Sequence, residues 1–130
     1  MDLFAQCGPW AVITGASAGL GVQFARQLAL LGFHLALVAR RADRLEALAT
    51  ELQNAHGIQC RVIPLDLAAP DADRTLDEAT QDLDVGLFVN NAGLGYYGHF
   101  LKQDRERLAG LIQLNCHAVA MLAHRFANRL

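Results

Sequence analysis

Four apolar segments recur along the chain, and each is bounded by glycine or polar residues. They read "WAVIT" (10–14), "LALVA" (35–39), "CRVIPLDL" (60–67) and "VGLFVNN" (85–91). Runs of this length and character predict buried strands. Their spacing of roughly 25 residues leaves room for one helix between consecutive strands. The pattern therefore predicts a βαβαβαβ order.

The intervening segments show helical periodicity. A first helix is predicted to begin near Gly19 and to face the sheet with Leu20, Phe24, Leu28 and Leu31. A second is predicted over residues 42–56, where Gly57 follows as a stop, and a shorter one over 71–81. Residues 104–130 predict a long helix with a wide apolar surface, formed by Leu108, Leu111, Ile112, Leu114, Met121, Leu122 and Phe126.

Alternating strands and helices define the expected fold class. Crossover connections between successive strands are right-handed and produce a parallel sheet covered on both faces. We therefore expect a Rossmann-like, doubly wound α/β fold in three layers. The expected strand order is 3-2-1-4, with a ligand crevice at the switch between strands 1 and 4. No repeat or linker interrupts residues 1–130, so we expect a single domain.

Composition narrows the classes of partner. The chain has 130 residues, 53% of them hydrophobic, and a formal net charge of −2. This balance provides no basic field for nucleic acid or for a membrane surface. No apolar run reaches the roughly 20 residues of a membrane span, and "MDLFAQCGPW" lacks the features of a signal peptide. We expect a cytoplasmic protein whose partner is a small molecule or a second copy of the chain.

The cysteines and histidines indicate no metal site. Three cysteines without a CxxC pair predict small buried thiols rather than a disulfide framework or a zinc site. The histidines are scattered, and packing or solvent exposure is the expected role even for the two that lie seven residues apart in the last predicted helix. The residues concerned are Cys7, Cys60, Cys116, His34, His56, His99, His117 and His124.

The stretch "VITGASAGLG" (12–21) places three glycines where the first strand must turn into a helix. Glycine permits positive φ and lets a ligand approach the backbone closely. The free N–H groups of a helix start suit a pyrophosphate, and the hydroxyls of Thr14 and Ser17 could add contacts. Taken alone, the same glycines are weak evidence, because a tight turn needed for packing also uses them.

Four motifs in one order resemble the short-chain dehydrogenase/reductase family across nearly the whole chain. "TGASAGLG" resembles its TGxxxGxG cofactor motif, and "DL" at Asp66–Leu67 follows the third predicted strand. "NNAG" at Asn90–Gly93 ends the fourth, and Asn115 lies within "LNCHA" on the following helix. The four together are far more specific than any one of them.

The resemblance implies roles for these residues. The dinucleotide would be held by the glycine loop through Gly15, Ser17, Gly19, Leu20 and Gly21. Asp66 and Leu67 would contact the adenine, and Asn91, Ala92 and Gly93 would line the nicotinamide side. Asn90 would steady the sheet, and Asn115 would belong to the catalytic site.

The same polar residues also have local interpretations. The carboxylate of Asp66 could accept from an adenine amino group or stabilise a turn. Asn90 and Asn91, at the end of a buried strand, need partners for their amides, which a structural network would supply. Asn115 interrupts an apolar helical face, which suggests a local kink or a bound water.

The residues after the second strand bear on the choice of cofactor. An acidic residue there selects NAD, whereas an arginine accommodates the 2′-phosphate of NADP. The sequence has Ala39 followed by Arg40 and Arg41, a pattern that resembles NADP-preferring members. We therefore expect NADP rather than NAD. The alternative is that both arginines are solvated residues at the start of a helix.

The tyrosine and lysine that the family uses for proton transfer are absent, because the chain contains no YxxxK. Its only lysine, Lys102, lies five residues after Tyr97, and Tyr96 precedes that tyrosine. An ordinary tyrosine titrates near about 10 and needs a nearby cation to act at neutral pH. We interpret both tyrosines as packing or substrate-side loop residues.

The resemblance therefore implies the N-terminal half of an oxidoreductase that moves hydride between nicotinamide and a carbonyl or alcohol. This chain alone is expected to bind cofactor without turnover. The alternative is a non-catalytic nucleotide-binding or sensor module. Relatives pack the last helix against another subunit, and that helix has a second apolar stripe here, so we expect a homo-oligomer.

Overall fold

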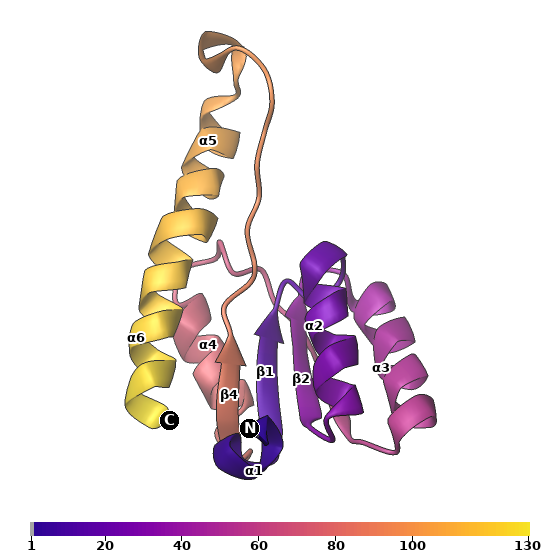
Figure 1. The fold of residues 1–130 in the computed structure, drawn as a ribbon. Coiled ribbons are helices and arrows are strands. Elements are labelled where there is room, and N and C mark those ends of the chain that lie inside the picture. The colour runs from indigo at the N-terminus through magenta and orange to yellow at the C-terminus, as the bar shows by residue number, and fades with distance from the viewer. Residues whose placement is uncertain (1) are drawn as a thin grey trace.

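The computed structural model describes residues 2–130 and shows three layers around a parallel sheet (Figure 1). Its four strands lie in the order β3-β2-β1-β4. This arrangement confirms the predicted strand order and the Rossmann-like class. The strands are β1 (Trp10–Thr14), β2 (His34–Ala39), β3 (Cys60–Pro64) and β4 (Val85–Val89).

Helices cover both faces of the sheet (Figure 1). Helices α2 (Gly19–Leu30) and α3 (Ala42–His56) lie on one face, and α4 (Ala72–Ala79) and α6 (Val119–Arg129) lie on the other. Helix α5 (Arg105–Ile112) continues through the π-helical segment η2 (Gln113–Ala118) into α6. Helix α5 thus extends beyond the sheet, where the short helix η1 (Phe100–Lys102) precedes it.

The core has two parts, one on each face of the sheet. Alternate residues of β1 point to opposite faces, so that Ala11 and Ile13 pack with α2 and α3, whereas Val12 packs with α4 and α6. All three are fully buried. On the α6 side, the rings of Phe88 and Phe126 stack with centroids 4.2 Å apart. The central strands β1 and β2 are thus buried on both faces, which explains their continuous apolar runs.

Helix α2 faces the sheet with a different stripe from the one predicted. Leu20, Phe24 and Leu31 are 70%, 43% and 51% exposed, and of the four predicted residues only Leu28 is buried. The buried positions are Gly21, Ala25, Leu28 and Ala29. Small residues form the buried stripe because α2 lies close to the end of β1: a Cβ on Gly21 would lie 2.0 Å from the Gly15 carbonyl oxygen. The periodicity of apolar residues does not reveal how closely a helix packs.

A short N-terminal helix, α1 (Leu3–Cys7), was not predicted. It lies at the end of the sheet where β4 begins (Figure 1). The register of β4 against β1 shifts there, from Trp10 opposite Val85 to Ala11 opposite Leu87, so that Gly86 is an extra residue. A Cβ on Gly86 would coincide with the carbonyl group of Cys7. Glycine is therefore required where α1 contacts this bulge.

The cysteines differ from one another in exposure. Cys7 and Cys60 are half-buried, whereas Cys116 is exposed, which corrects the expectation of three buried thiols. Burial raises the pKa of the Cys60 thiol to about 11, so this sulfur stays protonated at neutral pH.

No helix within residues 2–130 combines the length and apolar character needed to cross a membrane.

A bidentate ion pair ties β3 to the segment before β4. The guanidinium of Arg61 donates to both carboxylate oxygens of Asp82, at 2.7 and 2.8 Å, and to the carbonyl of Ala79 at 3.0 Å. The bonds from Arg61 lower the pKa of Asp82 to about 2. The carboxylate is thus favoured in the folded chain.

We predict that Asp82→Asn lowers the free energy of unfolding at pH 7. The stabilising effect of a depressed pKa is present above the unfolded value of about 3.9 and is lost as pH falls towards 2. Urea unfolding at pH 7 and pH 2.5 should show the difference from wild type shrinking at the lower pH. Glu78→Gln, which removes an exposed carboxylate outside this pair, is the control. A pH-independent difference would contradict this account.

Candidate functional site

A cavity of about 430 Å³ opens at the carboxyl ends of the strands. Residues from the ends of β1, β2, β3 and β4 line it, which is where a doubly wound sheet binds ligands. The structure brings together eight of the predicted site residues around this cavity: Gly15, Ser17, Arg40, Arg41, Asp66, Leu67, Ala92 and Gly93. Gly19, Leu20, Gly21, Asn90, Asn91 and Asn115 do not line it.

The junction between β1 and β4 is closed by Thr14. Its fully buried hydroxyl accepts from the backbone N–H groups of Asn91, at 2.9 Å, and Ala92, at 3.0 Å, and donates to Val89 O at 3.3 Å. The side-chain amide of Asn91 in turn donates to the Thr14 carbonyl at 3.1 Å. The expected ligand contact of Thr14 is therefore wrong, because its hydroxyl is buried and already bonded within the protein.

The glycine turn leaves the start of α2 open. Gly15 has φ +68°, and a Cβ there would lie 2.9 Å from Ala92 Cα, so this glycine is needed for packing as well as for the turn. Gly19 has φ +58° and open space where a Cβ would project. Ala18, at the N-cap, provides no side-chain hydrogen bond. The first N–H groups of α2 are thus free of a side-chain cap and suit an anion.

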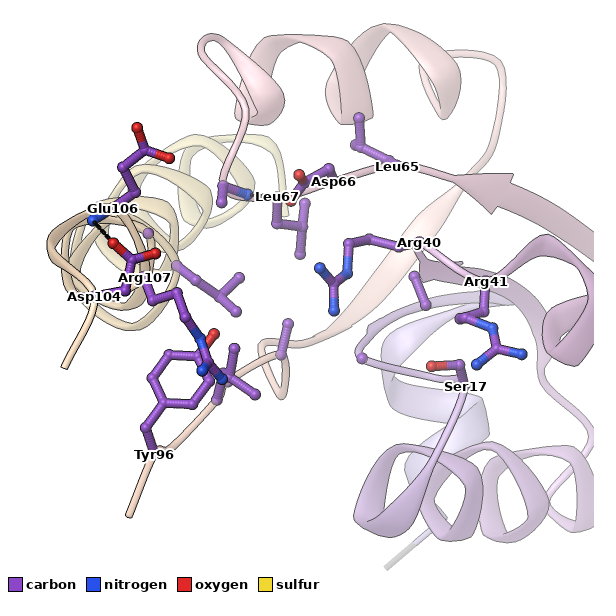
Figure 2. Close-up of a pocket in the computed structure, with 18 residues that line it drawn as sticks. Ser17, Arg40, Arg41, Leu65, Asp66, Leu67, Tyr96, Asp104, Glu106 and Arg107 are labelled. Atoms are coloured by element: carbon purple, nitrogen blue, oxygen red, sulfur yellow. Dashed lines mark hydrogen bonds between the residues drawn. The ribbon is translucent and has the colours of Figure 1, made fainter. Parts of the chain in front are cut away.

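The two arginines after β2 differ in their partners. Arg40 is exposed, lines the cavity and forms no ion pair with any residue from 2 to 130. Arg41 also lines the cavity, but its guanidinium pairs with Asp43 at 3.3 Å. Figure 2 shows the two guanidinium groups pointing in different directions from adjacent positions. Arg40 is therefore the arginine free to bind an anionic ligand.

Asp66 stabilises a turn and also lies on the cavity wall, the two roles that the sequence left open. Its Oδ1 accepts from the backbone N–H of Ala68 at 3.0 Å, which stabilises the turn after β3. The residue is also exposed on the cavity wall beside Leu67 (Figure 2). A turn role and a ligand contact are thus compatible, because the second carboxylate oxygen has no partner among residues 2–130.

The amide of Asn90 joins β4 to the last helix. Its Nδ2 donates to the carbonyl of Val119 at 2.9 Å, and this bond ties the end of β4 to the start of α6. Its Oδ1 is buried and has no partner within the described chain.

Asn115 lies in the π-helical segment η2, a local distortion of the kind its sequence context suggested. Its side chain makes two bonds with the backbone of Leu94: Oδ1 accepts from the N–H at 2.9 Å and Nδ2 donates to the carbonyl at 2.6 Å. This pair fixes the segment after "NNAG" against the helix.

The opposite wall of the cavity comes from the loop after β4, from α5 and from the start of η2. Tyr96, interpreted from the sequence as a packing or substrate-side loop residue, lies on this wall, as does Leu114 of η2, predicted as part of the apolar surface of the long helix. The sequence did not single out the other residues of this wall, which are Leu94, Asp104, Glu106, Arg107 and Gly110. The Arg107 guanidinium lies 4.0 Å from the centre of the Tyr96 ring (Figure 2). The spacing 107, 110, 114 is the one available signal, because it places these residues on one helical face.

The other tyrosine does not fit a packing role. Tyr97 is fully exposed, and Lys102 in η1 is exposed as well. Neither lines the cavity.

A parallel sheet of this order, with a glycine turn at the crevice, defines the class of doubly wound nucleotide-binding folds. The family model for short chain dehydrogenase matches residues 9–130. The chain therefore belongs to the short-chain dehydrogenase family.

Individual relatives agree with this assignment. The chain is 40% identical over 114 residues to a very-long-chain 3-oxoacyl-CoA reductase of Neurospora crassa, covering 84% of this chain and 34% of that protein. A short-chain dehydrogenase from Sphingobium yanoikuyae, solved with NADPH, superposes with a TM-score of 0.87 at 36% identity, covering 94% of this chain and 48% of that one. A bulky-bulky ketone specific alcohol dehydrogenase from Comamonas testosteroni superposes with a TM-score of 0.88 at 34% identity, covering 95% and 50%. The chain thus spans about a third of the length of the curated relatives it matches.

We predict that Thr14→Val destabilises the fold by about 1–3 kcal/mol, the cost of a buried N–H left without an acceptor. The Ala92 N–H loses its acceptor, whereas the Asn91 N–H keeps a bond to Val89 O at 3.1 Å. Thr14→Ser keeps the hydroxyl and should cost less than half as much. Chemical denaturation of the three proteins measures the difference. A serine variant as strongly destabilised as the valine variant would contradict the dominant role of the hydroxyl.

Proposed function

We propose that this chain forms the NADP-binding part of an oxidoreductase that transfers hydride between nicotinamide and a carbonyl or alcohol. The observation that carries the proposal is Arg40, a cation on the cavity wall with no protein partner among residues 2–130. Ala39 precedes it, so that no carboxylate stands at the end of β2 to repel a 2′-phosphate. The NADPH bound by the Sphingobium relative supports this choice.

The remaining parts of the cavity suit the rest of a dinucleotide. The uncapped start of α2, beside Gly15 and Ser17, suits the pyrophosphate. Asp66 and Leu67 suit the adenine, and Ala92 and Gly93 lie towards the nicotinamide side. When bound, NADPH supplies the hydride, and the protein supplies its orientation.

Asn115 acts in this proposal as a positioning residue. Its two bonds to Leu94 hold the segment that continues from Ala92 and Gly93. A fixed segment here keeps the wall of the nicotinamide side in one place, which matters because catalysis depends on the alignment of reacting atoms.

The substrate class follows from the relatives. The curated relatives are named very-long-chain 3-oxoacyl-CoA reductases, and the Comamonas relative is named for ketones. We propose that the substrate is a ketone, and a 3-oxoacyl thioester is the first compound to test.

We propose further that this 130-residue chain binds the cofactor without turning substrate over. It contains no YxxxK, and its two tyrosines are Tyr96, which lies under Arg107, and Tyr97, which is exposed and does not line the cavity. No tyrosine of the chain is thus paired with a lysine in the manner that proton transfer requires.

Binding titrations with NADPH and NADH test the cofactor proposal. We expect Arg40→Ala to weaken NADPH binding by roughly tenfold to a hundredfold, because charge-assisted hydrogen bonds contribute about 1.5–3 kcal/mol. NADH binding should be unchanged. Arg44→Ala removes an equal charge from an exposed position of α3 outside the cavity wall and is the matched control. Equal affinities of the wild-type chain for both cofactors would overturn the NADP preference.

Self-association is the second expectation to test. Ile112 and Met121, on the long helix, are 61% and 40% exposed, so an apolar surface lies outside the core. We propose that a second copy covers it. Sedimentation should show a concentration-dependent dimer or larger species, and Met121→Glu should shift it towards monomer. A stable monomer at all concentrations would contradict the proposal.

A further inference from the structure

The second arginine after β2 is bonded to a carboxylate on its own helix. Arg41 Nη2 lies 3.3 Å from Asp43 Oδ2, and Arg41 Nε lies 3.5 Å from Asp43 Oδ1. Both side chains are more than half exposed. The pair is therefore a surface ion pair, of the kind whose stabilising effect is small and which a stronger anion can displace.

The two members of the pair are placed differently with respect to the cavity. Arg41 is the N-cap residue of α3 and lines the cavity, whereas Asp43 lies in the first turn of α3 and does not. Figure 2 shows the Arg41 guanidinium on the Ser17 side of the cavity, apart from the guanidinium of Arg40. Arg40, Arg41 and Ser17 thus surround one end of the site, and one of the two cations already has a carboxylate partner.

We propose that Asp43 limits the preference of this chain for NADPH over NADH by competing with the 2′-phosphate for Arg41. This inference rests on the proposed function and adds a residue that does not line the cavity. A carboxylate and a phosphate accept from the same guanidinium N–H groups. The binding free energy that the phosphate obtains from Arg41 is therefore reduced by the free energy of the Arg41–Asp43 pair that it displaces.

The charge state of Asp43 is consistent with this competition. The hydrogen bonds from Arg41 lower the pKa of Asp43, so the carboxylate is ionised at neutral pH. The competition acts on NADPH and leaves NADH, which has no 2′-phosphate, unaffected.

A purely structural role for Asp43 makes a different prediction. An acidic residue in the first turn of a helix is favoured by the helix dipole, and an ion pair can hold Arg41 in a useful position. In that case, removing the carboxylate would lower stability or weaken NADPH binding. The competition that we propose predicts tighter NADPH binding, which a damaged fold does not produce.

A double-mutant cycle tests the proposal with wild type, Asp43→Asn, Arg41→Ala and the double variant, each titrated with NADPH and NADH at constant ionic strength. Asp43→Asn should tighten NADPH binding by about two- to fivefold, the range of an exposed ion pair. NADH binding should be unchanged. In the Arg41→Ala background, Asp43→Asn should give no gain. Glu46→Gln, one turn further along α3, removes an equal charge and should change neither affinity.

Three outcomes would overturn the inference: weaker NADPH binding in Asp43→Asn, an equal gain for NADH, or a gain that persists without Arg41. Each leaves the proposed function standing, because wild type would still prefer NADPH. If wild type binds neither cofactor, the proposed function itself fails and the inference fails with it.

Discussion

The hydrogen bonds between Thr14 and the end of β4 determine the geometry of the site. One buried hydroxyl accepts from the N–H groups of Asn91 and Ala92, and the Asn91 amide donates back to the Thr14 carbonyl. The contact brings the exit of β4 so close to the glycine turn that Gly15 has no room for a side chain. The crevice, the start of α2 and the segment that Asn115 fixes all take their positions from this junction.

The sequence predicts the sheet well because both faces of the central strands β1 and β2 are buried. Runs such as "WAVIT" have no polar face to confuse their assignment, and Gly57, in the left-handed region, ends α3 where expected. The orientation of α2 was predicted wrongly, because the pattern weighs the size of side chains and not the distance between backbones. Leu20 and Phe24 are apolar but remain outside, since only residues as small as Gly21 and Ala25 fit against the sheet.

About half of the residues that line the cavity could be predicted. Those that directly follow a strand were predicted, and those from the later loop and helix were not. The motif residues, among them Ser17, Arg40 and Asp66, follow strands directly, so their place at the crevice follows from the topology. The α5 face could not be predicted, because its approach depends on how far the long helix extends beyond the sheet. For Tyr96 the sequence left packing and a place in the substrate-side loop both open. The pairing of Arg41 with Asp43, and the inward direction of the Thr14 hydroxyl, are likewise properties of rotamers that a sequence pattern does not encode.

The π-helical segment η2 gives the long helix one place where its residue count can change without a change of orientation. A π-turn accommodates one residue more than an α-turn, whereas a residue added to or lost from a regular α-helix turns the rest of the helix by about 100°. Deleting a single residue between Gln113 and Ala118 would therefore allow a regular α-helix while α5 and α6 kept the faces that they present now. The same deletion within α5 would turn part of the cavity wall away from the crevice, because Leu122 and Phe126 hold the helix in the core.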